Sequence, residues 1–326
     1  MQLKQPLTQL PIRFDAERLA AEIAALPTDA WTPHPNGFPG NDAVRLVTPE
    51  GKDSDRLFGP MAPTEQLKAC PYIVDIMADL GAVWGRSRLM GLGPGADVPP
   101  HVDINYYWRT HVRIHIPIVT NPGVEFTVDG ETRHLAAGEC WALDTFRSHT
   151  VSNRGDERRV HLVLDTVGGE RLWDLVRQGE SGASAGPVAE LSRAQVDRLQ
   201  FERVNAPKIM SPWEIKCHIA DLLAATRPDP ALDAVAACLD RFITGWASTW
   251  ARFEADDAGL ADYARLLQSV RTDLRALPGE QLTLANGRAL YFVLDALVFS
   301  SAMSEHRGAR QASYLGAPGA RPRLAS

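Results

Sequence analysis

The stretch Pro99-Pro100-His101-Val102-Asp103 decides how this chain is interpreted. Two consecutive prolines disfavour a helix and hold the backbone extended. Side chains two residues apart in an extended segment point to the same face, so the imidazole of His101 and the carboxylate of Asp103 can meet at one point in space. On its own a His-x-Asp pair is more typical of an exposed loop than of a metal site. Combined with a third donor from elsewhere, it predicts a metal site on β-structure.

His149 is the candidate third donor. It lies between two strand-like runs, at residues 138–144 and 150–153. Two histidines and one carboxylate on one side of a metal form the facial triad that suits non-haem Fe(II) oxygenases, with open positions on the other side. A co-substrate and dioxygen would bind at those open positions.

Arg159 follows His149 in a run, 158–165, that alternates as a half-buried strand does. An arginine that points inward beside a metal needs an anionic partner, because an unpaired buried charge is very costly. A dicarboxylate co-substrate would supply that partner through a bidentate guanidinium–carboxylate pair.

Motifs spread over about a quarter of the chain resemble the aspartyl/asparaginyl β-hydroxylase family of Fe(II)/2-oxoglutarate-dependent dioxygenases, which includes bacterial proline cis-hydroxylase-like members. The matching motifs are His101-x-Asp103, Arg113-x-His115-x-Pro117, Gly138-Glu-x-Trp141-x-x-Asp144, His149-x-Val151-x-Asn153 and Arg159-x-His161-Leu-Val-Leu-Asp165. Some peptide-hydroxylating members lack the acidic ligand. This chain keeps Asp103, as the members that act on free amino acids do.

The resemblance implies an all-β double-stranded β-helix, jelly-roll or cupin-like, with flanking helices. It also implies a catalytic Fe(II) held by His101, Asp103 and His149, with 2-oxoglutarate and O2 as co-substrates. By the same resemblance, Arg159 would bind 2-oxoglutarate, with assistance from the residues Arg113 and His115.

The run 104–110, which follows Asp103, contains an aromatic cluster with one arginine and is a candidate substrate wall. We expect Arg109 to bind a substrate carboxylate, beside Tyr107 and Trp108. The alternative, that the aromatic residues only pack the mouth of the barrel, is equally compatible with the sequence.

The expected reaction, implied by the resemblance, is hydroxylation of an unactivated C–H bond with release of succinate and carbon dioxide. A small amino acid or amino-acid derivative is the favoured substrate. Two alternatives stay open: a hydroxylase of Asp or Asn side chains in a peptide or protein, and a non-catalytic metal-binding barrel that acts as a sensor or interaction module. A lipid acyl chain is disfavoured.

The composition of the 326 residues is that of an ordinary globular enzyme. A net charge of −6 gives no case for a nucleic-acid partner. None of the four cysteines forms a CxxC pair, and no signal-type or bilayer-length apolar run is present, so we expect a cytoplasmic protein without a membrane partner. The sequence leaves the oligomeric state open, and a homodimer is compatible with it.

Composition and periodicity predict four segments. Residues 1–178 form the β-helix domain, with its core at 86–167, and 179–190 form a Gly/Ser-rich linker. Residues 191–307 show helical apolar spacing and predict an all-α C-terminal domain, with helices near 213–226, 230–253, 258–277 and 285–303. Residues 308–326 are expected to be a disordered tail.

Overall fold

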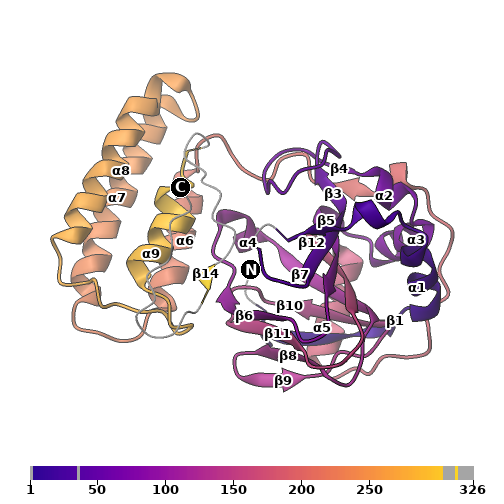
Figure 1. Cartoon of the computed structure of the whole chain (residues 1–326). Helices are drawn as coiled ribbons and strands as arrows, with labels where there is room; N and C mark the ends of the chain where they lie inside the picture. Colours follow the sequence, from indigo (N-terminus) through magenta and orange to yellow (C-terminus); the bar gives the residue numbers. More distant parts are fainter. Residues whose placement is uncertain (1–2, 35–36, 304–312, 315–326) are drawn as a thin grey trace. The chain divides into compact units, whose positions relative to one another are not determined.

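The structure, a computed structural model, describes residues 3–34, 37–303 and 313–314 (Figure 1). The chain divides into two compact units. The first contains residues 1–103, 107–205 and 312–326, and the second contains residues 104–106 and 206–311. Each unit is described by itself.

Two β-sheets form the centre of the first unit. The larger sheet has the strand order β1-β10-β7-β12-β5-β3-β2, with β13 paired to β5 and β4 paired to β3. Its strands are β1 (Leu7–Arg13), β2 (Thr32–Pro33), β3 (Asn41–Pro49), β4 (Met61–Pro63), β5 (Val83–Leu92), β7 (Val112–Val119), β10 (Glu139–Leu143), β12 (Arg159–Gly168) and β13 (Gln200–Phe201).

The smaller sheet has the strand order β14-β6-β11-β8-β9. Its strands are β6 (Asp97–Val102), β8 (Val124–Val128), β9 (Glu131–Arg133), β11 (His149–Asn153) and β14 (Ser313–Tyr314). From β5 to β12 the chain passes repeatedly between the sheets: β5, β7, β10 and β12 lie in the larger one, and β6, β8, β9 and β11 in the smaller one. All pairings among these eight strands are antiparallel, and the predicted β core is confirmed.

The larger sheet has one apolar face and one polar face. In β7 and β12 the alternate residues Ile114, Ile116, Leu162 and Leu164 belong to one hydrophobic core together with residues of the helices. Those helices are α1 (Ala16–Ala24), α2 (Glu65–Lys68), α3 (Pro71–Leu80) and α5 (Glu170–Glu180). The residues between them, which include the charged ones, therefore point to the opposite face of the sheet, as the alternation predicts.

A hairpin joins β8 to β9 through Asp129 and Gly130, whose φ angles are 49° and 86°. Positive φ at both central residues is the geometry of the tight turn that suits the twist of a hairpin, and Asp-Gly is a strong signal for it. The turn therefore follows from these two residues.

Helices make up the second unit, as predicted. They are α6 (Pro212–Ala224), α7 (Leu232–Phe253), α8 (Leu260–Arg275), α9 (Leu290–Leu294) and a π-helical turn over Asp295–Phe299. Figure 1 shows α7 and α8 as the two long helices of this unit. Trp246 is fully buried; its indole N–H donates to the carbonyl of Met210 at 2.9 Å, and its ring lies 4.4 Å from that of Tyr263.

The boundary between the units, after Asn205, lies further along the chain than the predicted start of the helical domain at residue 191. Backbone bonds explain the difference. The N–H of Ala189 donates to the carbonyl of Arg13, and β13 pairs with β5. Composition alone cannot reveal these long-range bonds. Apart from residues 313–314, the predicted disordered tail lies outside the described residues.

Candidate active site

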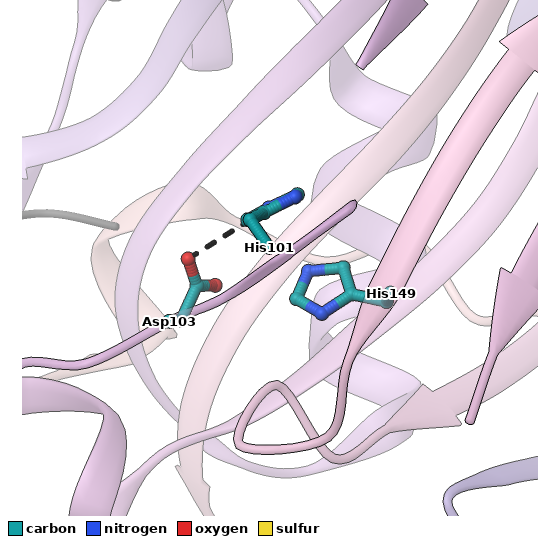
Figure 2. A group of neighbouring side chains, drawn as sticks. All are labelled: His101, Asp103 and His149. Carbon is teal, nitrogen blue, oxygen red and sulfur yellow. Dashed lines mark ion pairs between the residues drawn. The ribbon is translucent and has the colours of Figure 1, made fainter. Parts of the chain in front are cut away.

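The structure brings His101, Asp103 and His149 together. One donor atom from each residue lies within 4.8 Å of the donor atoms of the other two. His101 at the end of β6 is paired directly with His149 at the start of β11, and their ring centroids are 4.1 Å apart. Figure 2 shows the side chains of this group, with His101 and Asp103 on one segment and His149 on a neighbouring one. The sequence spacing brings His101 and Asp103 together, and the pairing of β6 with β11 adds His149 as the third donor.

Backbone carbonyls orient both imidazoles. Nδ1 of His101 lies 2.9 Å from the carbonyl oxygen of Pro99, and Nδ1 of His149 lies 2.9 Å from that of Arg147. A carbonyl can only accept, so each Nδ1 carries the proton, and in the neutral ring Nε2 keeps its lone pair. This outer-shell arrangement is typical of metal-ligating histidines.

The surroundings of His149 favour the neutral ring. Burial, followed by the nearby His101, holds the pKa of His149 well below its usual value. A metal binds neutral imidazole and ionised carboxylate. The two imidazoles and the Asp103 carboxylate therefore fit Fe(II), for which two histidines and one carboxylate are a suitable donor set.

Arg159, the first residue of β12, is a buried cation without an anionic partner in the described chain. Its side chain is buried, and no carboxylate among the described residues lies within 4.0 Å of it. Burial lowers its pKa to about 9. Its Nε has no hydrogen-bond partner, while one terminal nitrogen donates to Nδ1 of His161 at 2.7 Å. Such a guanidinium is suited to receive a carboxylate from a ligand.

His115 and His161 lie beside Arg159 on the polar face of the sheet. Their ring centroids are 5.8 Å apart, and both ring nitrogens of His115 lack hydrogen-bond partners, as does Nε2 of His161. Burial, with the neighbouring arginines, holds both pKa values well below the usual value, so both rings are neutral. Buried polar atoms without partners are rare in folded proteins and indicate a ligand that would bind here.

Arg113 has different surroundings. Its Nε donates to Oδ1 of Asp165 at 2.8 Å, and one terminal nitrogen donates to Oδ2 of Asp103 at 3.0 Å. The second terminal nitrogen lies 3.4 Å from Oδ2 of Asp165. The predicted assistance of 2-oxoglutarate by Arg113 stays a prediction, and the observed partners of its guanidinium are both protein carboxylates.

Arg86 and Arg88 are two charged residues on the polar face of the larger sheet that belong to none of the motifs. They lie two residues apart in β5, which pairs with β12, and both are buried. Arg86 has Asp165 at 3.8 Å, and no carboxylate among the described residues lies within 4.0 Å of Arg88. Burial, then the charges of Arg86 and Arg113, lower the pKa of Arg88 to about 9. The Arg-x-Arg spacing is the sequence signal for these residues, since it places both side chains on one face of a strand.

The three candidate substrate residues belong to a short helix, α4 (Tyr106–Thr110), which the sequence did not predict. Tyr107 is fully buried; its hydroxyl accepts the backbone N–H of Arg86 at 2.8 Å. Trp108 is also buried, with the guanidinium carbon of Arg113 4.4 Å from its ring centroid. The guanidinium of Arg109 lies 5.7 Å from the ring of Phe146. Their contact with a substrate stays a prediction.

His111 is a structural histidine. Its Nε2 lies 2.7 Å from Oε1 of the buried Glu202, and its Nδ1 lies 2.5 Å from the carbonyl oxygen of Tyr107. Both ring nitrogens are therefore engaged. This contact attaches the segment after β13 to the strand that carries Arg113.

The structure thus has a predominantly antiparallel two-sheet core, a His-Asp-His cluster and a buried arginine, which agrees with the expectation from the motifs. Residues 56–168 match the model of the family described as aspartyl/asparaginyl beta-hydroxylase, which confirms the resemblance.

Among curated proteins, the chain is 25% identical over 163 residues to L-proline cis-4-hydroxylase from Rhizobium meliloti (strain 1021). The match spans 47% of this chain and 58% of that protein's length.

The chain also aligns with two solved structures. One is an oxidoreductase of the 2OG-Fe(II) oxygenase family from Burkholderia pseudomallei, with 17% identity, a TM-score of 0.37, and coverage of 51% of this chain and 87% of that one. The other is a Pseudomonas putida prolyl-4-hydroxylase, with 16% identity, a TM-score of 0.36, and coverage of 51% and 95%. Among the described residues, no helix is both long enough and apolar enough to cross a membrane.

Proposed function

We propose that this chain is an Fe(II)- and 2-oxoglutarate-dependent oxygenase that hydroxylates a C–H bond of a small amino acid or amino-acid derivative. One observation carries the proposal: a His-Asp-His donor set lies in the same β core as a buried arginine that lacks a carboxylate partner in the described chain. The buried arginine does not contribute to stability without a ligand, since an uncompensated buried charge is destabilising. The alternation of β5 to β12 between two sheets supports a double-stranded β-helix for the catalytic core.

The balanced reaction consumes the substrate, 2-oxoglutarate and O2, and yields the hydroxylated substrate, succinate and carbon dioxide. Iron bound by His101, Asp103 and His149 would supply the oxidising chemistry, which is the cofactor's rather than the protein's. The protein's own part is to bind and orient the reactants and to keep water out.

Arg159 would bind a carboxylate of 2-oxoglutarate through its fork of N–H groups. In the ligand-free chain its terminal nitrogen donates to Nδ1 of His161, so the neutral ring of His161 carries its proton on Nε2. That N–H, and the N–H of the neutral His115, are donors that lack acceptors in the described chain. They are suited to the remaining oxygens of the co-substrate.

Arg86 and Arg88 support a substrate that carries a carboxylate. Nε and one terminal nitrogen of Arg86, and one terminal nitrogen of Arg88, have no hydrogen-bond partner. Asp165, the carboxylate near Arg86, already accepts from Arg113. This face therefore carries more buried cations than anions, and a small carboxylic acid would restore the balance. A free amino acid is favoured over an internal peptide residue, which has no α-carboxylate.

The test is substrate-stimulated succinate formation. Iron-loaded protein would be incubated with 2-oxoglutarate and O2, with free amino acids in one panel and short Asp- or Asn-containing peptides in the other. We expect stimulation by a free amino acid and loss of that stimulation when its carboxylate is amidated. Stimulation only by peptides would support the second candidate, a peptide Asp/Asn hydroxylase, and would exclude a free amino acid. Iron binding without 2-oxoglutarate binding would contradict the oxygenase assignment and favour a metal-binding sensor or interaction barrel.

A further inference from the structure

The two carboxylate oxygens of Asp103 have different neighbours. Oδ1 lies 4.0 Å from Nε2 of His101, on the side of the metal-binding group. Oδ2 accepts a hydrogen bond from Arg113 at 3.0 Å. Oδ1 of Asp103 therefore faces the other donor atoms, whereas Oδ2 is held by the Arg113 cation.

Arg113 is itself fixed from two further directions. Asp165 lies directly opposite it in the pairing of β7 with β12, and accepts from Nε at 2.8 Å and from a terminal nitrogen at 3.4 Å. The ring of Trp108 lies 4.4 Å from the guanidinium carbon. Burial alone would lower the pKa of Arg113, but the carboxylates of Asp165 and Asp103 raise it. The side chain is a permanent cation with all three guanidinium nitrogens engaged.

The energetics oppose a move of Arg113 to another partner. All three side chains of the ion-paired group Asp103–Arg113–Asp165 are buried. If Arg113 turned towards a ligand, it would leave a buried carboxylate unpaired, and loss of one partner of a buried pair is strongly destabilising. Arg159 bears no such cost, because no carboxylate among the described residues lies within 4.0 Å of it.

We propose that Arg113, anchored by Asp165, is the positioning residue of the metal-binding carboxylate Asp103, and that it determines metal affinity rather than 2-oxoglutarate affinity. The inference rests on the proposed function in one respect, that Asp103 is a metal ligand. Arg113 holds Oδ2, so that Oδ1 is the oxygen presented beside His101. Partners of this kind typically change metal affinity about 10- to 100-fold when they are removed.

The experiment measures two affinities separately. Anaerobic competition with a chromophoric chelator gives the Kd for Fe(II), and titration of metal-saturated protein gives the Kd for 2-oxoglutarate. The variants are Arg113→Gln and Asp165→Asn, with Arg159→Gln as the matched arginine on the same sheet. We expect Arg113→Gln and Asp165→Asn to weaken Fe(II) binding about 10- to 100-fold and to leave the 2-oxoglutarate affinity at saturating metal unchanged. Arg159→Gln should weaken 2-oxoglutarate binding and leave the Fe(II) affinity unchanged.

A double-mutant cycle tests whether Arg113 acts through Asp103. In an Asp103→Ala background, Arg113→Gln should have no further effect on the Kd for Fe(II), because the group it positions is gone. An equal loss in both backgrounds would overturn the proposal. So would a weakening of 2-oxoglutarate binding by Arg113→Gln with unchanged Fe(II) affinity, which is the result that a co-substrate ligand would give.

Two controls keep the test decisive. Asp165→Asn keeps the shape of the side chain and leaves Arg113 paired with Asp103, so it reports on positioning if Arg113→Gln fails to fold. Arg113→Lys keeps the charge but cannot contact both carboxylates in the same way, and should recover part of the Fe(II) affinity. Failure of the wild-type protein to bind Fe(II) would reject the proposed function, whereas normal Fe(II) binding in both Arg113→Gln and Asp165→Asn would reject this inference alone.

Discussion

Replacement of Arg159 by glutamine should separate co-substrate binding from metal binding. The guanidinium is 4% exposed and has no carboxylate within 4.0 Å among the described residues. Loss of one partner of a buried charge pair costs about 2–5 kcal/mol. Since about 1.4 kcal/mol corresponds to a factor of ten, the Kd for 2-oxoglutarate should rise about 30- to 5000-fold. The neighbouring imidazoles of His115 and His161 are neutral and cannot replace the charge, which favours the upper part of that range.

The assay is anaerobic titration of Fe(II)-loaded protein with 2-oxoglutarate, followed through the visible charge-transfer band. The matched control is Arg158→Gln. Arg158 is adjacent in sequence, but its side chain is 39% exposed and pairs with Asp42. It should bind 2-oxoglutarate like the wild type. Equal affinity in Arg159→Gln and wild-type protein would refute the assignment of this site.

The same substitution has a second expected effect, on stability. A buried charge without a partner destabilises the ligand-free fold, because burial disfavours the charged form. Arg159→Gln should therefore raise the Tm of the ligand-free protein, while 2-oxoglutarate should no longer increase that Tm. A fall in Tm would indicate that Arg159 has a stabilising partner in the ligand-free chain.

Three further predictions concern other parts of the site. His149→Ala should abolish stoichiometric Fe(II) binding in a metal analysis, whereas replacement of the exposed His134, just after β9, by alanine should retain it. Retained binding in His149→Ala would reject His149 as a ligand. Arg88→Gln should raise the KM for the stimulating substrate and leave the Kd for 2-oxoglutarate unchanged, and the opposite pattern would place the co-substrate at Arg88. Glu202→Ala should lower the free energy of unfolding in urea by about 1–3 kcal/mol, since it leaves a buried donor of His111 without its acceptor; unchanged stability would show that the bond contributes nothing.

Local patterns predicted much of this structure. The i, i+2 rule placed His101 and Asp103 on one face, and the structure adds the strand pairing that brings His149 to them. The Asp129-Gly130 pair is a local signal for the β8–β9 hairpin, and the alternation of apolar residues from Val112 to Ile118 is one for the apolar face of β7. These features depend on residues that are close together in the sequence, so local sequence patterns are enough to predict them.

Features that depend on which strands become neighbours could not be predicted. The contacts of Arg113 depend on the register between β7 and β12, which brings Asp165 opposite it. The burial of Tyr107 depends on β5, whose residue Gly85 leaves the space that the tyrosine hydroxyl occupies; an added Cβ would lie 2.3 Å from it. The extent of the first unit depends on β13, a strand of two residues. No periodicity is detectable in so short a segment.

The central position of β12 has a consequence for how this protein can vary. The strand is hydrogen-bonded to β5 on one side and to β7 on the other, and it carries Arg159, His161 and Asp165 on its polar face. Deletion of a single residue inside it would exchange its faces, sending leucines into the site and charges into the apolar core. Relatives can therefore alter their chemistry here by substitution but not by a change of length. Insertions and deletions should be confined to the turns that connect the strands.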